Sequence, residues 1–484
     1  MYHCYEYQYN LCLMKLSFMF SCFLLLFNST KAQYADDLIN KRHQPQDLKK
    51  DIDLVRKKLE KEHPNLYWYI DKNKLDQKFD SLKLSIKTPL KSVEFNARLM
   101  SVLSAIGDGH LVSFLDTNPL TEADYIKFNR FELPPVFQFE YRIMNDRLFI
   151  TKNLSKDESL APGTEVLSID GEPVKDILTK LKRSVQSDGY NETFKYALLN
   201  FGQFPVVHRS IYGWRDTVKF DLKLENTVSS IVLTTYKPEN TTVTKTASPG
   251  IVDEFKVFPP DFKVAYFKIG TFNDVGQRSD YKHIFEGIRQ NKANVLILDL
   301  RDNMGGDYLR CINTFSGFID KPTAFIRRPV ELIKGAILPS MNKQRQQQLD
   351  FLKAYGVLYP VMPDSNTFKG KLYVLINGGS FSATSLLAAN LQAMNNATFV
   401  GEETGGGRNG CTGGFYINEI LPNSKVTIRF GIVPYKILDQ SKVIGRGIMP
   451  DVPIQYTIED YLAKKDLEME WVLKDIEKNK GSVN

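Results

Sequence analysis

The chain has 484 residues, of which 43% are hydrophobic, 12% aromatic and 25% charged. This composition is typical of a folded protein with several domains, and it excludes collagen-like, low-complexity and disulfide-scaffold classes. The formal net charge of +7 is spread along the chain and is not gathered in a basic block, so we expect no nucleic-acid partner.

The first 32 residues have the pattern of a secretory signal peptide. Lys15 follows a second methionine, Met14, and precedes a short apolar run over residues 16–27. A polar stretch then ends in the small residue Ala32, after which we expect cleavage. Because the run is too short to span a bilayer comfortably, we predict export to the periplasm or the extracellular space and no integral membrane protein after cleavage. An uncleaved N-terminal anchor helix is the alternative, and Met14 is an alternative start of translation.

Removal of this segment leaves two cysteines, Cys311 and Cys411. A disulfide between them and two buried free thiols are equally compatible with the sequence. Neither cysteine has the spacing of a metal site, and the six histidines are scattered. We therefore predict no structural zinc, and we also expect no other metal and no cofactor.

Three regions follow in chain order. Apolar residues recur at helical spacing from about Asp47 to Ile106, and short strands dominate from Leu133 to about Leu224. From Val264 to Ile454 apolar strands alternate with helices, which predicts an α/β core with largely parallel strands. The tail after Thr457 has the pattern of an amphipathic helix.

A candidate nucleophile lies between the predicted strand 372–376 and the apolar helix that follows it. The segment Gly378-Gly379-Ser380-Phe381-Ser382-Ala383 would form a sharp strand-to-helix turn. A serine on such a turn exposes its hydroxyl, and the next amide points to where an oxyanion would form. Simple N-capping of the helix by Ser380 or Ser382 is the alternative.

A second candidate segment, 298–306, ends the most apolar predicted strand. Ligand sites in open α/β sheets lie at such strand ends, and adjacent glycines let backbone amides approach a substrate. We therefore expect Gly305 or Gly306 to supply a second oxyanion donor, with a plain turn as the alternative. Asp299 and Arg301 are expected to form an internal ion pair that holds this loop.

A third candidate is His110 in Gly107-Asp108-Gly109-His110, which closes the helical region. Flanking glycines would hold the histidine on a bare loop and not on a helix face. A serine nucleophile needs a base of near-neutral pKa, which histidine supplies. A structural, hydrogen-bonded histidine is the alternative.

Together these segments resemble the C-terminal-processing peptidase and tricorn core protease family of serine peptidases. The matching pieces are GDGH at 107–110, LILDLRDNMGG at 296–306, LINGGSFSATSLLAANLQ at 375–392, GEETGGG at 401–407 and GRGIMPD at 445–451. The resemblance implies an α/β fold: a crotonase/ClpP-like α/β core with a helical N-terminal subdomain and a PDZ-like module between them. The stretch Ala161 to Val174 looks like the second half of such a PDZ module.

The resemblance also implies roles. Ser382 matches the nucleophile and Ala383 one oxyanion donor, with Gly305 or Gly306 as the other. In the processing-peptidase branch the base is a lysine, whose place is taken here by Gly407, and the neighbouring Arg408 stays protonated at any useful pH. The tricorn-like branch uses a histidine that His110 matches, so we predict a histidine base.

Two positions depart from the tricorn-like pattern. Gly109 stands where that branch has a serine, and no glutamate precedes Gly445. The group that orients His110 is therefore left open, with three candidate carboxylates: Glu402, Glu403 and Asp439.

The predicted organisation is a signal peptide (1–32), a helical N-terminal subdomain with His110 (33–132), a PDZ-like domain (133–225), a linker or strand segment (226–262), an α/β peptidase core (263–456) and a C-terminal helix (457–484).

The predicted function is an exported serine peptidase acting on peptides or protein tails. The main alternative is a catalytically weak or inactive protein of this fold that binds peptides or apolar ligands. Acyl-CoA chemistry on a crotonase-type core fits poorly with export, because that cofactor is intracellular. The oligomeric state is left open.

Overall fold

A computed structural model describes residues 37–38, 40–117, 132–237, 253–258, 263–273, 281–327, 350 and 359–479. The predicted signal peptide, residues 1–32, lies outside the described residues. Within the described ranges, no helix combines the length and the apolar character needed to cross a membrane.

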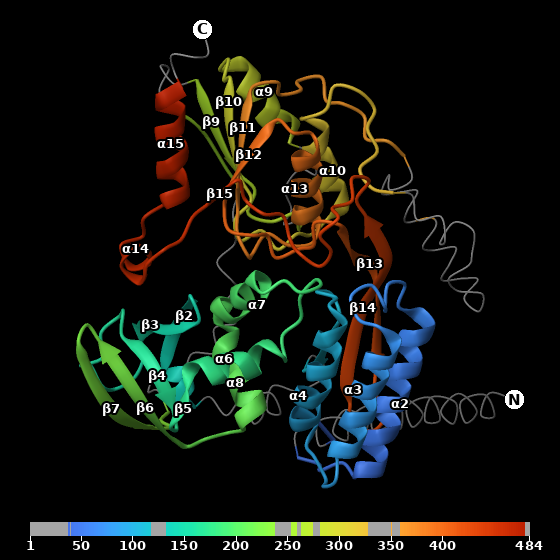
Figure 1. The fold of residues 1–484 in the computed structure, drawn as a ribbon, viewed down its shortest axis with the longest axis vertical. Coiled ribbons are helices and arrows are strands. Elements are labelled where there is room, and N and C mark those ends of the chain that lie inside the picture. Colours follow the sequence, from blue (N-terminus) through green and yellow to red (C-terminus); the bar gives the residue numbers. More distant parts are fainter. Residues whose placement is uncertain are drawn as a thin grey trace, which may run out of the picture.

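A six-stranded sheet forms the upper part of the molecule in Figure 1, in the order β15-β12-β11-β10-β9-β8. Its strands are β8 (Glu254–Val257), β9 (Val264–Lys268), β10 (Val295–Asp299), β11 (Lys371–Ile376), β12 (Ala397–Gly401) and β15 (Val452–Pro453). All neighbours are parallel except β8, which runs antiparallel to β9. The two central strands, β10 and β11, are almost continuously apolar because helices cover both faces of the sheet.

One face of this sheet is covered by α9 (Lys282–Gln290), α10 (Tyr308–Ser316) and α13 (Ala383–Ala393). On the other face, Val472 and Ile476 of α15 (Leu467–Asn479) pack against apolar side chains of the strands. The C-terminal segment was expected to be one helix, but a separate helix, α14 (Ile458–Leu462), precedes α15. The break is explained by Lys464, whose φ of 54° is incompatible with a continuing right-handed helix.

A second sheet, antiparallel at each of its strand pairs, has the order β2-β3-β4-β6-β7, with β5 paired to β4. Its strands are β2 (Phe139–Met144), β3 (Arg147–Asn153), β4 (Glu165–Ile169), β5 (Glu172–Pro173), β6 (Thr217–Leu224) and β7 (Thr227–Thr234). The helical segments of this middle module are η2 (Pro135–Gln138), α6 (Val174–Lys182), α7 (Thr193–Leu198), the π-helical η3 (Leu199–Gln203) and α8 (Phe204–Tyr212). Apolar residues of α6, η3 and α8 share a core with the sheet.

The middle module extends beyond the predicted boundary at residue 225. Strand β7 pairs along its whole length with β6 and so belongs to this sheet and not to a linker. The boundary was placed too early because most of β7 is exposed, so its sequence lacks the apolar alternation of a half-buried strand.

The N-terminal unit consists of α2 (Pro45–Glu62), α3 (Lys72–Ser85), α4 (Ser92–Leu103) and the short η1 (Ser104–Ile106), followed by β1 (Val112–Leu115). Leu48, Ile52, Val55 and Leu59 recur every three or four residues in α2 and are fully buried. These helices lie at the lower right of Figure 1, beside the middle module.

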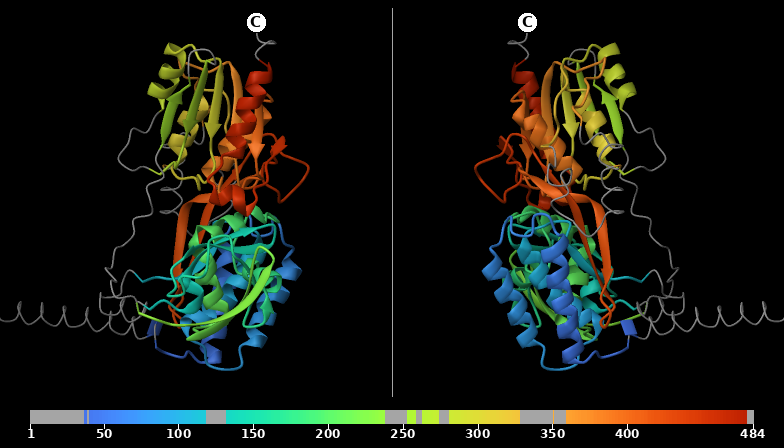
Figure 2. Two further views of the ribbon diagram at one scale, coloured as in Figure 1. Left: turned by 90° about the vertical axis from the view of Figure 1, so that its left-hand side faces the viewer. Right: turned by 90° about the vertical axis from the view of Figure 1, so that its right-hand side faces the viewer.

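A long hairpin joins the α/β core to the N-terminal unit. Strands β13 (Gly410–Ile420) and β14 (Val426–Lys436) leave the core and run along the helices, as Figures 1 and 2 show. Strand β1 pairs with β14, with Val112 opposite Arg429. The far half of the hairpin shares one apolar core with α2, α3 and α4, to which it contributes Leu421, Val426, Ile428, Phe430 and Ile432.

The buried carboxylate of Asp51 in α2 fixes the turn of this hairpin. It accepts hydrogen bonds from the Ser424 N–H and from the Asn423 side chain, each at 2.8 Å. The hairpin is therefore held in the N-terminal unit by polar contacts at its tip and by apolar packing along its length.

Substituting Phe430→Ala tests this arrangement, because Phe430 is fully buried between the hairpin and the helices. We expect a loss of about 3–5 kcal/mol in the free energy of unfolding, the usual effect of truncating a buried phenylalanine. The measurement is urea unfolding followed by circular dichroism. Val228→Ala in β7, where the side chain is 64% exposed, is the control and should change stability by less than about 0.5 kcal/mol. Equal losses in the two variants would contradict the packing role of Phe430.

Candidate active site

Ser382 lies at the turn between β11 and α13, at the N-cap position of that helix. Its backbone has φ 57° and ψ −123°, a conformation that costs a non-glycine residue about 1–3 kcal/mol. Its side chain makes no capping hydrogen bond. Ser380 is instead tied into the structure, because its buried hydroxyl donates to the Leu300 carbonyl and accepts from the Asn377 N–H. The strained backbone thus presents the Ser382 hydroxyl and not that of Ser380.

His110 meets Ser382 across the boundary between the N-terminal unit and the core. Its Nε2 lies 2.9 Å from Ser382 Oγ, although the two residues are 272 positions apart. The ring of Phe381 packs against the imidazole, with ring centroids 4.7 Å apart. Burial lowers the pKa of His110; the charge of Arg429 acts in the same direction and that of Asp108 opposes it. The imidazole is therefore neutral at neutral pH and able to accept a proton.

Asp108 is the carboxylate that faces the other nitrogen of the His110 ring. Its Oδ1 lies 3.9 Å from His110 Nδ1 and accepts the His110 backbone N–H at 2.7 Å. Its Oδ2 lies 2.8 Å from His63 Nε2 at the end of α2. Among the described residues, the buried His110 Nδ1 has no hydrogen-bond partner. A small movement of the ring would therefore bring Nδ1–H into contact with a carboxylate that is already held in place.

Asp188 adds a second buried carboxylate to this side of the ring. It comes from the loop between α6 and α7 and accepts the backbone N–H groups of Gly109 at 2.8 Å and Gly407 at 3.0 Å. Burial and the negative charge of Asp108 raise the pKa of Asp188 to about 7. The protonation of Asp188 therefore changes near neutral pH.

Asp108, Asp188 and His110 present ligand atoms that lie within 4.8 Å of one another, close enough to share a metal ion. Their carboxylate oxygens are, however, engaged by backbone amides and by His63. This donor set fits the orientation of an imidazole better than the coordination of a metal, so the absence of a metal cofactor stays our expectation.

Gly109 is required by this packing. A Cβ at Gly109 would lie 2.6 Å from the Phe381 ring, closer than packed atoms approach, and 3.0 Å from Asp188 Oδ1, which is a tight contact. The serine of the tricorn-like pattern would therefore not fit beside His110 without displacing Phe381.

The three carboxylates that the sequence suggested as partners of His110 are bound elsewhere. Glu402 accepts from the Gly378 N–H, Glu403 from Arg446 and the Gly447 N–H, and Asp439 from Arg408. In each case these hydrogen bonds of the carboxylate go to partners other than the His110 ring. Asp108 was missed although it lies within the GDGH segment. Asp188 was missed because no motif surrounds it in the sequence, and only the fold brings it close to His110.

Two backbone amides near Ser382 are candidates for holding an oxyanion, those of Ala383 and Gly306, which line the same cavity as Ser382. Ala383 is the first residue of α13, so its N–H has no acceptor within the helix. The Gly305 N–H already donates to Asn303 Oδ1 at 2.9 Å, which leaves Gly306 as the candidate of the glycine pair. Gly305 has a φ of +94°, and a Cβ there would lie 2.8 Å from Ser382 Cβ, so glycine is needed at this position for close approach.

Ser382, Ala383 and Gly306 line one cavity of about 310 Å³. Most of the other side chains around it are apolar or aromatic: Tyr308, Leu386, Cys411, Phe415, Tyr416 and Tyr435.

Cys411 and Cys311 are both buried and free, so the two cysteines do not form a disulfide.

Asp299 and Arg301 form an ion pair at the end of β10, with 2.7 Å between Arg301 Nη2 and Asp299 Oδ2. Arg301 also binds Asp466 and Glu468 in the C-terminal segment. This cluster joins the segment after β10 to the start of α15.

Comparison with known proteins gives the family of the core. The model of peptidase family S41 matches residues 263–454, which contain Ser382, Ala383, Gly305 and Gly306. The carboxy-terminal-processing protease of Bartonella bacilliformis is 25% identical over 199 residues, which cover 41% of this chain and 39% of that protein. Carboxyl-terminal-processing peptidase 2, chloroplastic, of Arabidopsis thaliana is 29% identical over 144 residues, which cover 30% of this chain and 24% of that protein. The chain thus matches well under half the length of either relative.

The fold as a whole is similar to a solved structure. The crystal structure of mature CPAF matches with a TM-score of 0.58 over 90% of this chain and 96% of that chain, at 14% sequence identity. The mixed α/β architecture is therefore shared beyond the core alone. By its sequence match, the chain carries a domain of peptidase family S41 over residues 263–454.

Proposed function

We propose that this protein is an exported serine peptidase that hydrolyses peptide bonds with Ser382 as nucleophile and His110 as general base. The observation that carries the proposal is the 2.9 Å distance between His110 Nε2 and Ser382 Oγ, formed by residues of different structural units. Such a contact between a hydroxyl and a neutral imidazole is what nucleophilic catalysis by serine requires.

In the proposed mechanism, His110 takes the proton of Ser382 while Oγ attacks the carbonyl carbon of the scissile bond. The N–H groups of Ala383 and Gly306 hold the negative oxygen of the tetrahedral intermediate. His110 then protonates the leaving amine. In the second half of the reaction, His110 takes a proton from a water molecule that attacks the acyl-enzyme, and it returns this proton to the Ser382 oxygen as the acid product leaves. The cavity lined by Ser382, Ala383 and Gly306 supports this assignment.

Asp108 is proposed as the residue that orients His110 and stabilises its protonated form. The 3.9 Å separation from Nδ1 exceeds a hydrogen bond, but catalytic contacts commonly shorten when substrate binds. The contact between Asp108 and His63 supports this role, because it fixes the carboxylate from the far side.

The substrate is proposed to be a peptide or protein tail with an apolar side chain at the cleaved bond. The largely apolar and aromatic lining of the cavity beside Ser382 supports this preference, since desolvated apolar pockets bind apolar groups.

Export is part of the proposal and is supported by the signal-like pattern of residues 1–32.

We also propose that the core is crotonase/ClpP-like, which its parallel strands with helices on both faces support. A PDZ-like identity of the middle module is supported by its antiparallel sheet and by α6, which follows the Asp170-Gly171 turn.

Substituting Ser382→Ala tests the nucleophile. We expect peptidase activity to fall by about 10⁴-fold or more, because the attacking oxygen is removed. Hydrolysis of a fluorogenic peptide with an apolar residue at the cut measures this, together with covalent labelling by a fluorophosphonate followed by intact mass. Ser380→Ala is the matched control and should still be labelled. A wild-type protein that folds but is neither labelled nor active would instead favour the non-catalytic binding protein.

Substituting Asp108→Asn tests the orienting carboxylate. We expect kcat to fall by about 10²- to 10⁴-fold with little change in KM, because the protonated imidazole loses its negative partner. Steady-state kinetics measure this, and Asp108→Glu should restore part of the rate. Unchanged kcat in a folded Asp108→Asn variant would remove Asp108 from the mechanism.

The pH profile tests the second carboxylate. Activity should rise with pH as His110 loses its proton, with a midpoint below the usual histidine value because burial lowers its pKa. A further rise is expected near the Asp188 pKa of about 7, since ionised Asp188 adds a negative charge that favours the imidazolium formed in the transition state. The profile of kcat/KM against pH measures both steps. Asp188→Asn should lose the upper step and keep the lower one, and an unchanged profile would show that Asp188 is not coupled to His110.

A further inference from the structure

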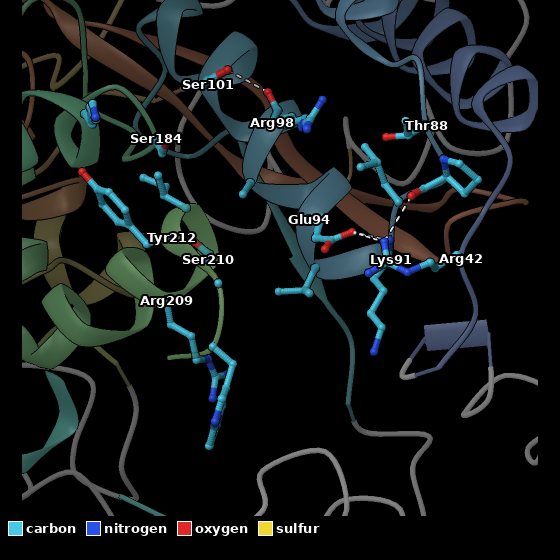
Figure 3. A pocket seen from close by; sticks show the side chains of 18 of the residues that line it. Arg42, Thr88, Lys91, Glu94, Arg98, Ser101, Ser184, Arg209, Ser210 and Tyr212 are labelled. Atoms are coloured by element: carbon cyan, nitrogen blue, oxygen red, sulfur yellow. Dashed lines mark hydrogen bonds and ion pairs between the residues drawn. The ribbon is translucent and has the colours of Figure 1, made fainter. Parts of the chain in front are cut away.

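We propose that a basic cleft between the N-terminal unit and the middle module binds an acidic segment of the polypeptide substrate; the substrate assignment rests on the proposed peptidase function. The cleft has a volume of about 1030 Å³. Six cationic side chains line it: Arg42, Lys91 and Arg98 on the N-terminal unit, and Lys180, Arg183 and Arg209 on the middle module. Figure 3 shows the labelled side chains of the two walls on either side of the opening.

The cations of this cleft outnumber the nearby carboxylates. Glu94, the acidic residue in the lining, pairs with Arg42 at 3.2 Å. Just outside the lining, Glu172 pairs with Lys180 at 2.9 Å.

Of the remaining four cations, Lys91, Arg98 and Arg183 have no carboxylate within ion-pair distance in the described part of the chain. Arg98 and Arg183 are both exposed and belong to opposite walls. The cleft therefore holds a local excess of positive charge that a negatively charged ligand would neutralise.

The shape and chemistry of the cleft favour a peptide segment with aspartate or glutamate side chains. Its volume is at the upper end of the range of ligand pockets, much more than a single small anion needs. The planar fork of an arginine side chain matches a carboxylate with two parallel hydrogen bonds. Tyr212 and Trp214 add aromatic surface, and the Arg209 guanidinium lies 5.8 Å from the centre of the Trp214 ring.

Both walls continue directly into the candidate active site. Helix α4 leads through η1 to His110, and α6 leads to the loop that carries Asp188. The two extensions are joined by a hydrogen bond of 2.8 Å from the Gly189 N–H to the Gly107 carbonyl. An acidic segment bound in the cleft is thus anchored on the elements that hold His110, while another part of the same chain enters the site.

The binding test uses full-length protein with Ser382→Ala, so that the probe is not cut. The probe is a short fluorescein-labelled peptide rich in aspartate and glutamate, and its counterpart carries asparagine and glutamine. Fluorescence anisotropy should detect the acidic peptide and not its counterpart, with affinity falling as salt is raised. Arg98→Gln with Arg183→Gln should weaken binding about tenfold, since two exposed charge contacts are removed.

Lys57→Gln with Lys61→Gln is the matched control, because it removes two charges from exposed positions of α2 outside the cleft. This control should leave the affinity unchanged. Equal weakening by both pairs, or equal binding of the uncharged peptide, would overturn the proposal. Tighter binding of a single-stranded RNA than of the acidic peptide would assign the cleft to a different class of partner and also overturn it.

The cleavage test uses wild-type protein and one cleavable peptide with either an acidic or an uncharged extension. Because binding outside the reacting bond lowers KM without changing kcat, the acidic extension should lower KM about tenfold, and the Arg98/Arg183 variant should lose this effect. The two proposals fail separately. If the acidic peptide binds but no peptide is cleaved, the peptidase function is contradicted. If cleavage occurs with the same KM for both extensions, only the proposed role of the cleft is contradicted.

Discussion

The pairing of β1 with β14 is the constraint on which the site depends. His110 and Ser382 belong to different units, and the loop that carries His110 runs straight into β1. Because β14 is continuous from the core into the N-terminal unit, backbone hydrogen bonds fix the register of the two units to within one residue. Apolar packing of the hairpin against α2, α3 and α4 then prevents the units from sliding. A separation of 2.9 Å between base and hydroxyl is reached through the rigidity of a sheet and not through a flexible linker.

The surroundings of His110 show why the site is built from three parts of the chain. Asp108 and His63 come from the N-terminal unit, Asp188 from the middle module, and Gly407 from the core. Buried carboxylates are costly unless they accept hydrogen bonds, and here the donors of each come from more than one segment. The hydrogen bonds from Gly109 and Gly407 to Asp188 therefore also hold the three units together at the site. Removing one contact affects both the electrostatics of His110 and the packing of the units.

Local patterns in the sequence were enough to predict the parallel core strands, the turn with Ser382 and the loop with His110, because each depends on neighbouring residues. The end of the middle module was placed too early, since β7 is exposed on most of its surface. The depth to which β13 and β14 enter the N-terminal unit was not predicted, because pairing between distant strands leaves no local signal. The same holds for Asp188, which reaches His110 only through the tertiary fold.

The hairpin also dictates the order in which the molecule can fold. The helices of the N-terminal unit are synthesised first, but part of the apolar surface they need is supplied by residues more than 300 positions later, as in the contact of Asp51 with Ser424, which are 373 positions apart. Contacts of such long range form late and slow the folding of a domain. A chain that is still being synthesised therefore lacks both the completed helical core and the contact of His110 with Ser382. The contact between His110 and Ser382 can therefore form only after the segments on both sides of the hairpin have been synthesised.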